Sequence, residues 1–401
     1  MSNKTIAQIG RRSRFARLGS AVGGSAMGRG GSGILLPPAV YSSLRAPGGY
    51  GRTASAVGAH THAHNALTSL LNDDHTQYLL APRAKLRIVA PAGAPYTDPK
   101  TAIEACAAGD TVLILGGAYT PAAIAFPAGN ISVLGANSDG VVLNFTNVGA
   151  THCFNLGGHD GIHIADLTAN AAAGCTGDII LATNSDDILL ERLSLSGVAA
   201  YAAILSTASA NSHVRDCRLT TGGIRCLILY GVGHRVERNV LTCTNDTILA
   251  FMTRGDEGAV VGNTLYLTGA AVAGAAIYAD MTGSENCLFA DNRIVFTSAA
   301  AAARGIDLLA WAGAGLRHEV RNNLVVLVGA LGDGIRLETG GAGPSLNDCK
   351  LADNMVFNAA RGIRLHDANV SFTRVHDNQV VRTNTAAVSD AGTASDLSAN
   401  T

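Results

Sequence analysis

An asparagine recurs at the same place in six successive segments of the chain. Each lies three residues after an apolar residue and two before another, as in Val236-Glu-Arg-Asn-Val-Leu241. Apolar residues take the same position upstream, and the nine positions are 22 to 31 residues apart: Leu167, Leu193, Cys217, Asn239, Asn263, Asn292, Asn323, Asn354 and Asn378. A repeat of this length predicts a stack of similar units, none of which buries its apolar face without a neighbour.

Short alternating segments return in step with this pattern. Gly305-Ile-Asp-Leu308, Gly334-Ile-Arg-Leu337 and Gly362-Ile-Arg-Leu365 are examples. Alternation of this kind predicts short strands with one buried face. Strands that recur in the same order lie parallel to their counterparts, and such connections are right-handed. The expected fold is all-β: a right-handed single-stranded parallel β-helix over residues 85–390, with an extended amino-terminal arm and a polar carboxy-terminal tail at 391–401.

The six asparagines are expected to form one internal column. Neighbouring strands lie about 4.8 Å apart, so each side chain would stack on the next and hydrogen-bond to it. Such a ladder satisfies buried polar groups that otherwise cost roughly 1–3 kcal/mol each. Surface asparagines in left-handed turns are the alternative. The apolar residues that take the same position upstream favour the buried column.

The segment Lys100–Tyr119 predicts how the coil begins. It combines a short amphipathic helix, a Gly-Asp turn and an apolar strand. This arrangement resembles the entry segment of pectin-lyase-like β-helix proteins, in which the helix caps the first coil. A cap is needed because an uncovered end of stacked strands would recruit other chains. No acidic cluster resembles the calcium site of pectate lyases.

The eight cysteines contain no Cys-x-x-Cys pair. Their spacing favours reduced core residues over a disulfide framework or a zinc site. The chain also lacks an apolar run of about 18–20 residues and an apolar segment typical of a signal peptide. These features predict a soluble protein that is made in a cytoplasm and has no membrane partner.

Positive charge is concentrated at the amino terminus. Residues 1–72 contain no Asp or Glu, and eight basic residues lie within 1–58: Lys4, Arg11, Arg12, Arg14, Arg17, Arg29, Arg45 and Arg52. The whole chain has a net charge of −1, so the remainder carries −9. This Gly- and Ser-rich arm lacks the periodicity of a folded domain. We expect it to anchor the chain on other proteins. Nucleic-acid binding, disfavoured by the lack of interleaved aromatic residues, and a solubilising role are the alternatives.

A histidine-rich segment follows at residues 59–84. Its motif residues are Leu67, Leu70, Leu71, Asp73, Asp74, His75, Gln77 and Tyr78. This string of leucines and Asp-Asp-His-x-Gln-Tyr resembles a motif of bacteriophage tail fibres, tail spikes and related virion appendages. Joined to a β-helix, the resemblance implies an appendage of the virion, synthesised in the host cytoplasm and attached through its amino-terminal region. Trimers are the habitual state of such spikes.

Two features of this segment bear on assembly. The leucines form an apolar stripe too short to be a stable helix alone, so we expect a homotrimer to bury it; packing on the chain's own β-helix is the alternative. His60, His62 and His64 point the same way in an extended segment. Some phage fibre trimers hold an iron ion by similar His-x-His pairs, so the resemblance implies a transition-metal ion on the trimer axis. Solvent-facing histidines are the other interpretation, and no other cofactor is expected.

The outward positions of the second strand pattern carry the most reactive side chains. One column holds Tyr278, Asp307, Arg336 and Arg364, and a second holds Asp280, Leu309, Glu338 and His366. We expect a glycan-binding surface formed by Tyr278, Asp307, Arg336, Arg364 and His366. Guanidinium groups hold acidic sugars bidentately, which suits an anionic polysaccharide of the host surface.

The same columns allow an enzymatic alternative. Glycoside hydrolysis needs two carboxylates about 5–10 Å apart, and Asp307 and Glu338 would lie about 6–8 Å apart on adjacent strands. Charged columns on solvated sheets are more commonly salt-bridge ladders, and the chain has one tryptophan, Trp311, whereas sugar-cleaving grooves usually carry several aromatic platforms. The favoured hypothesis is a structural phage spike or fibre protein that contacts host polysaccharide. A polysaccharide depolymerase, hydrolase or lyase, on the same β-helix is the alternative.

Overall fold

The computed structural model describes residues 85–401, except for residues 147, 198–201, 224, 245–246, 254–256, 270–273, 300–302, 329–331, 342, 384, 399 and 401. The basic arm at 1–58 and the segment at 59–84, with its histidines and its leucine motif, lie outside the described residues. The expectations for anchoring, trimerisation and metal binding therefore remain predictions.

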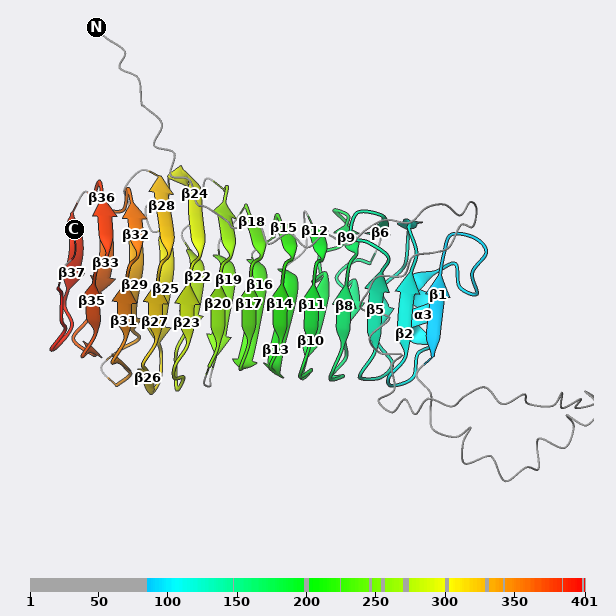
Figure 1. Cartoon of the computed structure of the whole chain (residues 1–401), viewed down its shortest axis with the longest axis horizontal. Helices are drawn as coiled ribbons and strands as arrows, with labels where there is room; N and C mark the ends of the chain where they lie inside the picture. The colour runs from blue at the N-terminus through cyan, green and yellow to red at the C-terminus, as the bar shows by residue number, and fades with distance from the viewer. Residues whose placement is uncertain are drawn as a thin grey trace, which may run out of the picture. The chain divides into compact units, whose positions relative to one another are not determined.

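The described chain winds into a right-handed parallel β-helix (Figure 1). Sheet A contains β1 (Leu86–Val89), β2 (Thr111–Ile114), β5 (Ser132–Gly135), β8 (His163–Ala165), β11 (Leu189–Glu191), β14 (His213–Arg215), β17 (Arg235–Glu237), β20 (Ala259–Val261), β23 (Leu288–Ala290), β27 (Glu319–Arg321), β31 (Lys350–Ala352) and β35 (Arg374–His376). Sheet B contains β3 (Gly117–Tyr119), β6 (Val141–Phe145), β9 (Thr168–Ala171), β12 (Ser194–Gly197), β15 (Arg218–Thr221), β18 (Val240–Cys243), β21 (Thr264–Leu267), β24 (Arg293–Ala299), β28 (Leu324–Val328), β32 (Met355–Phe357) and β36 (Gln379–Val381).

Sheet C contains β4 (Ile124–Ala125), β7 (Phe154–Asn155), β10 (Ile180–Thr183), β13 (Ala202–Ala210), β16 (Arg225–Val232), β19 (Thr247–Thr253), β22 (Ala275–Asp280), β25 (Arg304–Ala310), β29 (Asp333–Thr339), β33 (Arg361–Leu365) and β37 (Ala386–Asp390). Sheet C includes the two longest strands of the described coil, β13 and β16. A short sheet D, made of β26 (Ala314–Leu316), β30 (Ser345–Asn347) and β34 (Val370–Ser371), lies between sheets C and A in the last coils. It accounts for part of the longer repeat there.

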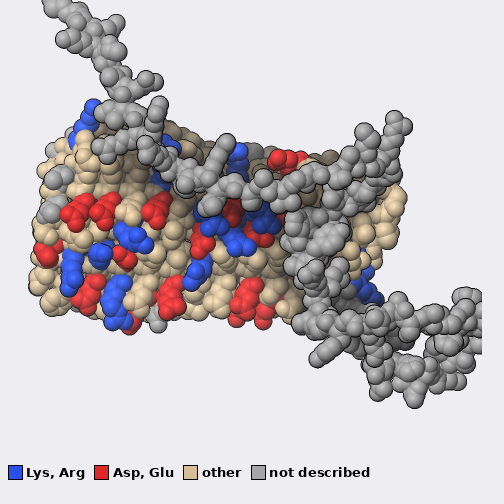
Figure 2. All heavy atoms as spheres, in the orientation of Figure 1, with Lys and Arg blue, Asp and Glu red and all other residues tan. Residues whose placement is uncertain are grey.

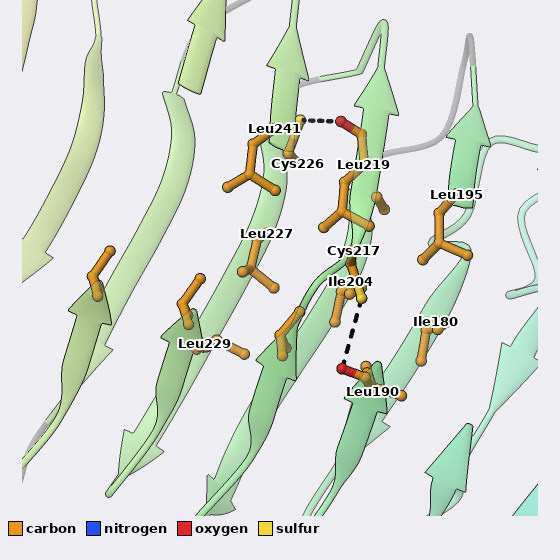
Figure 3. Packing of buried hydrophobic residues seen from close by; sticks show 14 of the residues in the cluster. Ile180, Leu190, Leu195, Ile204, Cys217, Leu219, Cys226, Leu227, Leu229 and Leu241 are labelled. Atoms are coloured by element: carbon orange, nitrogen blue, oxygen red, sulfur yellow. Dashed lines mark hydrogen bonds between the residues drawn. The ribbon is translucent and has the colours of Figure 1, made fainter. Parts of the chain in front are cut away.

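The interior of the coil is filled by inward side chains from successive strands. Figure 3 shows Ile180, Ile204 and Leu227 from sheet C near Leu195 and Leu219 from sheet B. These side chains belong to one continuous buried cluster that runs along the β-helix. Stacking identical levels of the coil is what removes this apolar surface from water, as expected for a solenoid.

The corner between sheets A and B is the same in nine successive coils. It consists of two residues, of which the first is in the left-handed region with φ between 51° and 68° and the second points inward. Arg238 (φ 54°) followed by Asn239 is one example. Asn, Asp and Gly tolerate this conformation best, and they supply most of the first positions.

The six repeated asparagines are the inward residues of these corners, and each is 1% exposed. The side-chain amide of Asn239 donates to Oδ1 of Asn263 over 3.0 Å, and the backbone N–H of Asn239 donates to the same oxygen over 2.9 Å. The pattern repeats through Asn292, Asn323, Asn354 and Asn378. The column is therefore internal, and each amide satisfies polar groups of the neighbouring coil.

The two ends of the β-helix differ in how well sequence predicted them. Helix α3 (Pro99–Glu104) buries Ala102 and Ile103 in the core beside β1 and β2, and Asp98 caps it by accepting from the N–H groups of residues 100 and 101 (Figure 1). The segment after residue 390 was expected to be a polar tail. Instead Thr393 bridges to Ser371 in parallel, so the described part of this segment continues the coil.

All eight cysteines are buried and in the reduced, thiol form. In Figure 3 the Cys217 thiol donates to the Leu190 carbonyl oxygen over 3.6 Å. Burial raises the pKa of Cys217 and Cys349 to about 12, so these thiols behave as small apolar residues. Over the described ranges, none of the helices has the length and apolar character needed to cross a bilayer.

Candidate functional site

The register of sheet C aligns the predicted outward columns. Tyr278 of β22 pairs with Asp307 of β25, which pairs with Arg336 of β29, which pairs with Arg364 of β33. Glu338 pairs with Leu309, so it lies diagonally across from Asp307 on the adjacent strand. Sequence alternation predicted this alignment because side chains in a strand point to alternate faces.

The exposure of these columns differs from the expectation. Asp307 is 0% exposed and Arg336 is 7% exposed, although both point away from the core. Ion pairs within β25 and between β25 and β29 cover them. Nε and Nη2 of Arg336 donate to the two oxygens of Asp307 over 2.9 and 3.0 Å. Nη1 of Arg304 donates to the same carboxylate over 2.9 Å.

The remaining charged groups of sheet C continue this network. Arg336 also pairs with Glu338, and Nδ1 of His366 lies 3.5 Å from the other Glu338 oxygen. Asp333 of β29 pairs with Arg361 and Arg364 of β33 over 2.9 and 3.3 Å. Burial alone would lower the pKa of Arg336, but hydrogen bonding to Asp307 and the nearby carboxylates outweigh it and raise the pKa. The network is thus a ladder of charge pairs.

Trp311 lies beside this ladder, immediately after β25. Its indole Nε1 donates to the Tyr278 hydroxyl over 2.9 Å, and its backbone N–H donates to the Thr282 hydroxyl over 2.9 Å. Asp280 orients that hydroxyl by accepting its hydrogen over 2.6 Å. The ring is held from neighbouring coils yet remains 57% exposed.

Gly340 allows the indole to lie close to the end of β29. A Cβ atom at this position would come within 2.4 Å of Cε3 of Trp311. Any side chain here would therefore displace the ring. Trp311 is an exposed aromatic platform whose Nε1 donates to Tyr278 and whose ring lies close to Gly340.

Trp311 forms one wall of a groove of about 400 Å³ on the outer face of sheet C. We call this the Trp311 groove; it is lined by Tyr278, Arg304, Leu309, Trp311, Arg336, Glu338, Thr339 and Gly340. Arg364 of β33 pairs with Asp333, and His366, which follows β33, pairs with Glu338; neither Arg364 nor His366 lines the groove. The combination of an aromatic surface with carboxylate and guanidinium groups suits a ligand that has both an apolar face and hydroxyl groups.

Sequence reasoning found part of the groove and missed the rest. Tyr278, Arg336 and Glu338 were predicted. Trp311 and Gly340, which line the groove, and Thr282, which accepts from Trp311, were not assigned to the site. The available signal was the position of the single tryptophan directly after the strand that carries Asp307. The presence of a single tryptophan argued against a sugar-cleaving groove, which usually carries several aromatic residues, so Trp311 itself was not predicted to line the site.

Other hollows on the described surface have a different character. One of about 570 Å³ lies near Arg235 and Glu257, and one of about 510 Å³ lies near Arg192 and Arg238. Neither is lined by Trp, Tyr or Phe among the described residues. Figure 2 shows acidic and basic side chains gathered in rows along one face of the β-helix. Pairs such as Arg192 with Asp166, at 2.6 Å, explain rows of this kind as surface ion pairs.

Within the described residues, no group of three or more His, Cys, Asp and Glu side chains is arranged to hold a metal ion. The three histidines of the predicted metal site, His60, His62 and His64, lie outside those residues.

No family model matches the chain. No curated protein matches it.

Solved structures do match, over most of the β-helix. The A-module of a mannuronan C-5 epimerase from Azotobacter vinelandii is 14% identical, with 75% of this chain and 94% of that chain covered and a TM-score of 0.52. This likeness shows the fold. The chain is a right-handed parallel β-helix protein.

Two further matches are weaker. A surface adhesin of Streptococcus pneumoniae is 10% identical over 75% of this chain and 86% of that chain, with a TM-score of 0.45. A protein of Geobacillus virus E2, the product of open reading frame 18, is 11% identical over 75% of this chain and 56% of that chain, with a TM-score of 0.43.

Proposed function

We propose that this β-helix protein is a structural spike or fibre protein of a bacteriophage virion that binds a host-surface polysaccharide in the Trp311 groove. The leucine and Asp-Asp-His-x-Gln-Tyr motif at residues 67–78 supports the virion assignment, because this motif resembles those of phage appendages. The β-helix supplies the rigid surface, and the amino-terminal arm supplies the attachment to the particle.

The observation that carries the binding function is the immobilised ring of Trp311. A pyranose ring has an apolar face of C–H groups that packs on an aromatic surface, while its hydroxyl groups need polar partners at the edge. Trp311 is fixed by Tyr278, Thr282 and Gly340 before any ligand arrives. A platform that is already ordered loses little conformational entropy on binding.

Binding is favoured over cleavage by the position of Arg336. A hydrolytic pair needs space between its two carboxylates for a sugar and an acid or a water molecule. The guanidinium group of Arg336 contacts both Asp307 and Glu338, and therefore takes up that space. Asp307, at 0% exposed, has no surface from which to reach a substrate. A depolymerase on this fold would have to place its carboxylates elsewhere.

The test is binding of purified bacterial capsular and O-antigen polysaccharides, measured by titration calorimetry. Trp311→Ala should weaken binding about tenfold or more, the equivalent of about 1.4 kcal/mol. Phe372→Ala is the matched control, because Phe372 is 60% exposed and does not line the groove. Equal affinity of the wild type and Trp311→Ala would refute the assignment of the groove.

A second measurement separates the two functions. We expect no reducing ends and no unsaturated uronates when the protein is incubated with a polysaccharide that it binds. Release of either product, abolished in Asp307→Asn or Glu338→Gln, would establish the depolymerase instead.

A further inference from the structure

The charges around the Trp311 groove are already neutralised within the protein. Arg304 and Arg336 line the groove, and both pair with Asp307, which lies buried beneath them. Arg336 also pairs with Glu338. Two guanidinium groups therefore face two carboxylates, and the site carries no excess positive charge.

An acidic sugar would have to compete with these pairs. Nε and Nη2 of Arg336 are the donors that would grip a carboxylate bidentately, and both are occupied by Asp307. Withdrawing them would leave Asp307 buried with a single remaining cation, Arg304. Removing one partner of a buried pair is strongly unfavourable, because the other charge is left uncompensated.

The exposed polar atoms of the groove favour a different ligand. Glu338 is partly exposed, and its oxygens can accept hydrogens from sugar hydroxyls while Arg336 and His366 hold the carboxylate in place. The same carboxylate repels a second negative charge. The hydroxyl of Thr339 donates its hydrogen to Asp367 over 2.8 Å. Glu338 carries the one carboxylate among the described residues that line the groove, and a charged acceptor forms the stronger hydrogen bond.

We propose that the Trp311 groove selects an uncharged pyranose residue, with Trp311 under the sugar ring and Glu338 accepting from its hydroxyl groups. This inference rests on the proposed polysaccharide-binding function and narrows its ligand class. It replaces the anionic ligand expected from sequence, which required Arg336 and Arg364 to be free. In the structure both are paired, with Asp307 and Asp333 respectively.

The experiment uses the full chain and a panel of purified bacterial surface polysaccharides, half of them neutral and half carrying uronate or sialate. We expect neutral members to bind, with an affinity that changes less than twofold between 50 and 500 mM NaCl, because salt screens only charge–charge attraction. Binding confined to the acidic members, and weakened by salt, would overturn the inference. If no polysaccharide binds in a Trp311-dependent way, the proposed function itself fails.

A substitution at Glu338 should change the binding affinity in opposite directions for neutral and for acidic polysaccharides. Glu338→Gln should weaken binding of a neutral polysaccharide about tenfold, because a hydrogen bond to a charged acceptor is lost. The same change would strengthen binding of an acidic polysaccharide, because a repulsive charge is removed. Glu319→Gln is the control: Glu319 is paired with Lys350 on sheet A, outside the groove. Stronger binding by Glu338→Gln would therefore refute the neutral ligand.

Discussion

Asn378 donates a hydrogen bond from its side-chain amide to Oδ1 of Asn400 over 3.0 Å. Asn400 in turn donates to the carbonyl oxygen of Val375 over 2.9 Å. The asparagine column therefore continues into the last coil and satisfies polar groups that the end of the stack would otherwise leave open.

Replacing a buried member of the column should depend strongly on the replacement. Asn323→Asp should be the more damaging change, because its new oxygen would face the carbonyl oxygen of Phe289 and Oδ1 of Asn354, to which the amide now donates. Asn323→Leu should be milder, because leucine already fills this position at Leu167 and Leu193. We expect losses of roughly 3–5 kcal/mol and 1–3 kcal/mol in the free energy of unfolding, measured with urea.

The neighbouring residue supplies the control for this comparison. Asn322 is exposed at the same corner, and Asn322→Asp makes the same chemical change outside the core. It should cost less than about 0.5 kcal/mol. Equal losses in the free energy of unfolding for Asn322→Asp and Asn323→Asp would contradict the buried column.

Stability should fall in mildly acidic solution because of two buried histidines. Burial lowers the pKa of His234 and of His318 to about 4, whereas an unfolded histidine titrates near 6.5. Between these values the unfolded chain binds protons that the native chain does not. Each buried, neutral histidine therefore contributes to the free energy of unfolding in full above about pH 6.5. This contribution, about 3 kcal/mol for each histidine, is lost as the pH falls to 4.

Urea unfolding at pH 7.5, 6, 5 and 4.5 measures this effect. The double variant His234→Asn, His318→Asn should flatten the dependence, since asparagine can accept the backbone N–H groups of Ser212 and Cys287 that the two Nδ1 atoms now accept. His376→Asn, at a partly exposed position, should leave the slope intact. A pH slope that persists unchanged in the double variant would argue against the two histidines.

Deleting residues 1–58 should leave a folded β-helix that fails to join the particle. We expect this because eight basic residues are concentrated in this arm, outside the repeat that forms the core. Circular dichroism would report the fold, and particle composition would report incorporation. Normal incorporation of the truncated protein would show that anchoring lies elsewhere.

Deleting residues 60–80 should weaken trimerisation without unfolding the coil. Leu67, Leu70 and Leu71 provide the apolar stripe that a homotrimer would bury. Light scattering of the full chain and of the deletion gives the molecular mass in each case. Elemental analysis of the full chain, with His60, His62 and His64 changed to Ala in the comparison, tests for a transition metal. A trimer mass that persists after the deletion would place the trimer contacts on the β-helix.

Periodicity predicted the fold well because each coil repeats the same local pattern. The repeated asparagines located the corners between sheets A and B. The alternation of apolar and polar residues located the outward columns of sheet C. It could not show that Asp307 is covered, because the burial of an outward residue depends on the side chains around it, here Arg304 of the same strand and Arg336 of the adjacent strand. The place of Trp311 was hidden for the same reason: its supports come from other coils.

The constant A–B corner has a consequence for how such a protein can change. Nine coils turn there in two residues, while the connections into and out of sheet C vary in length and include sheet D. Insertions at the variable side leave the asparagine column in register. The Trp311 groove lies on that variable side, at the end of β25. Evolution can therefore change the surface around the Trp311 groove repeatedly while the asparagine column and the core stay the same.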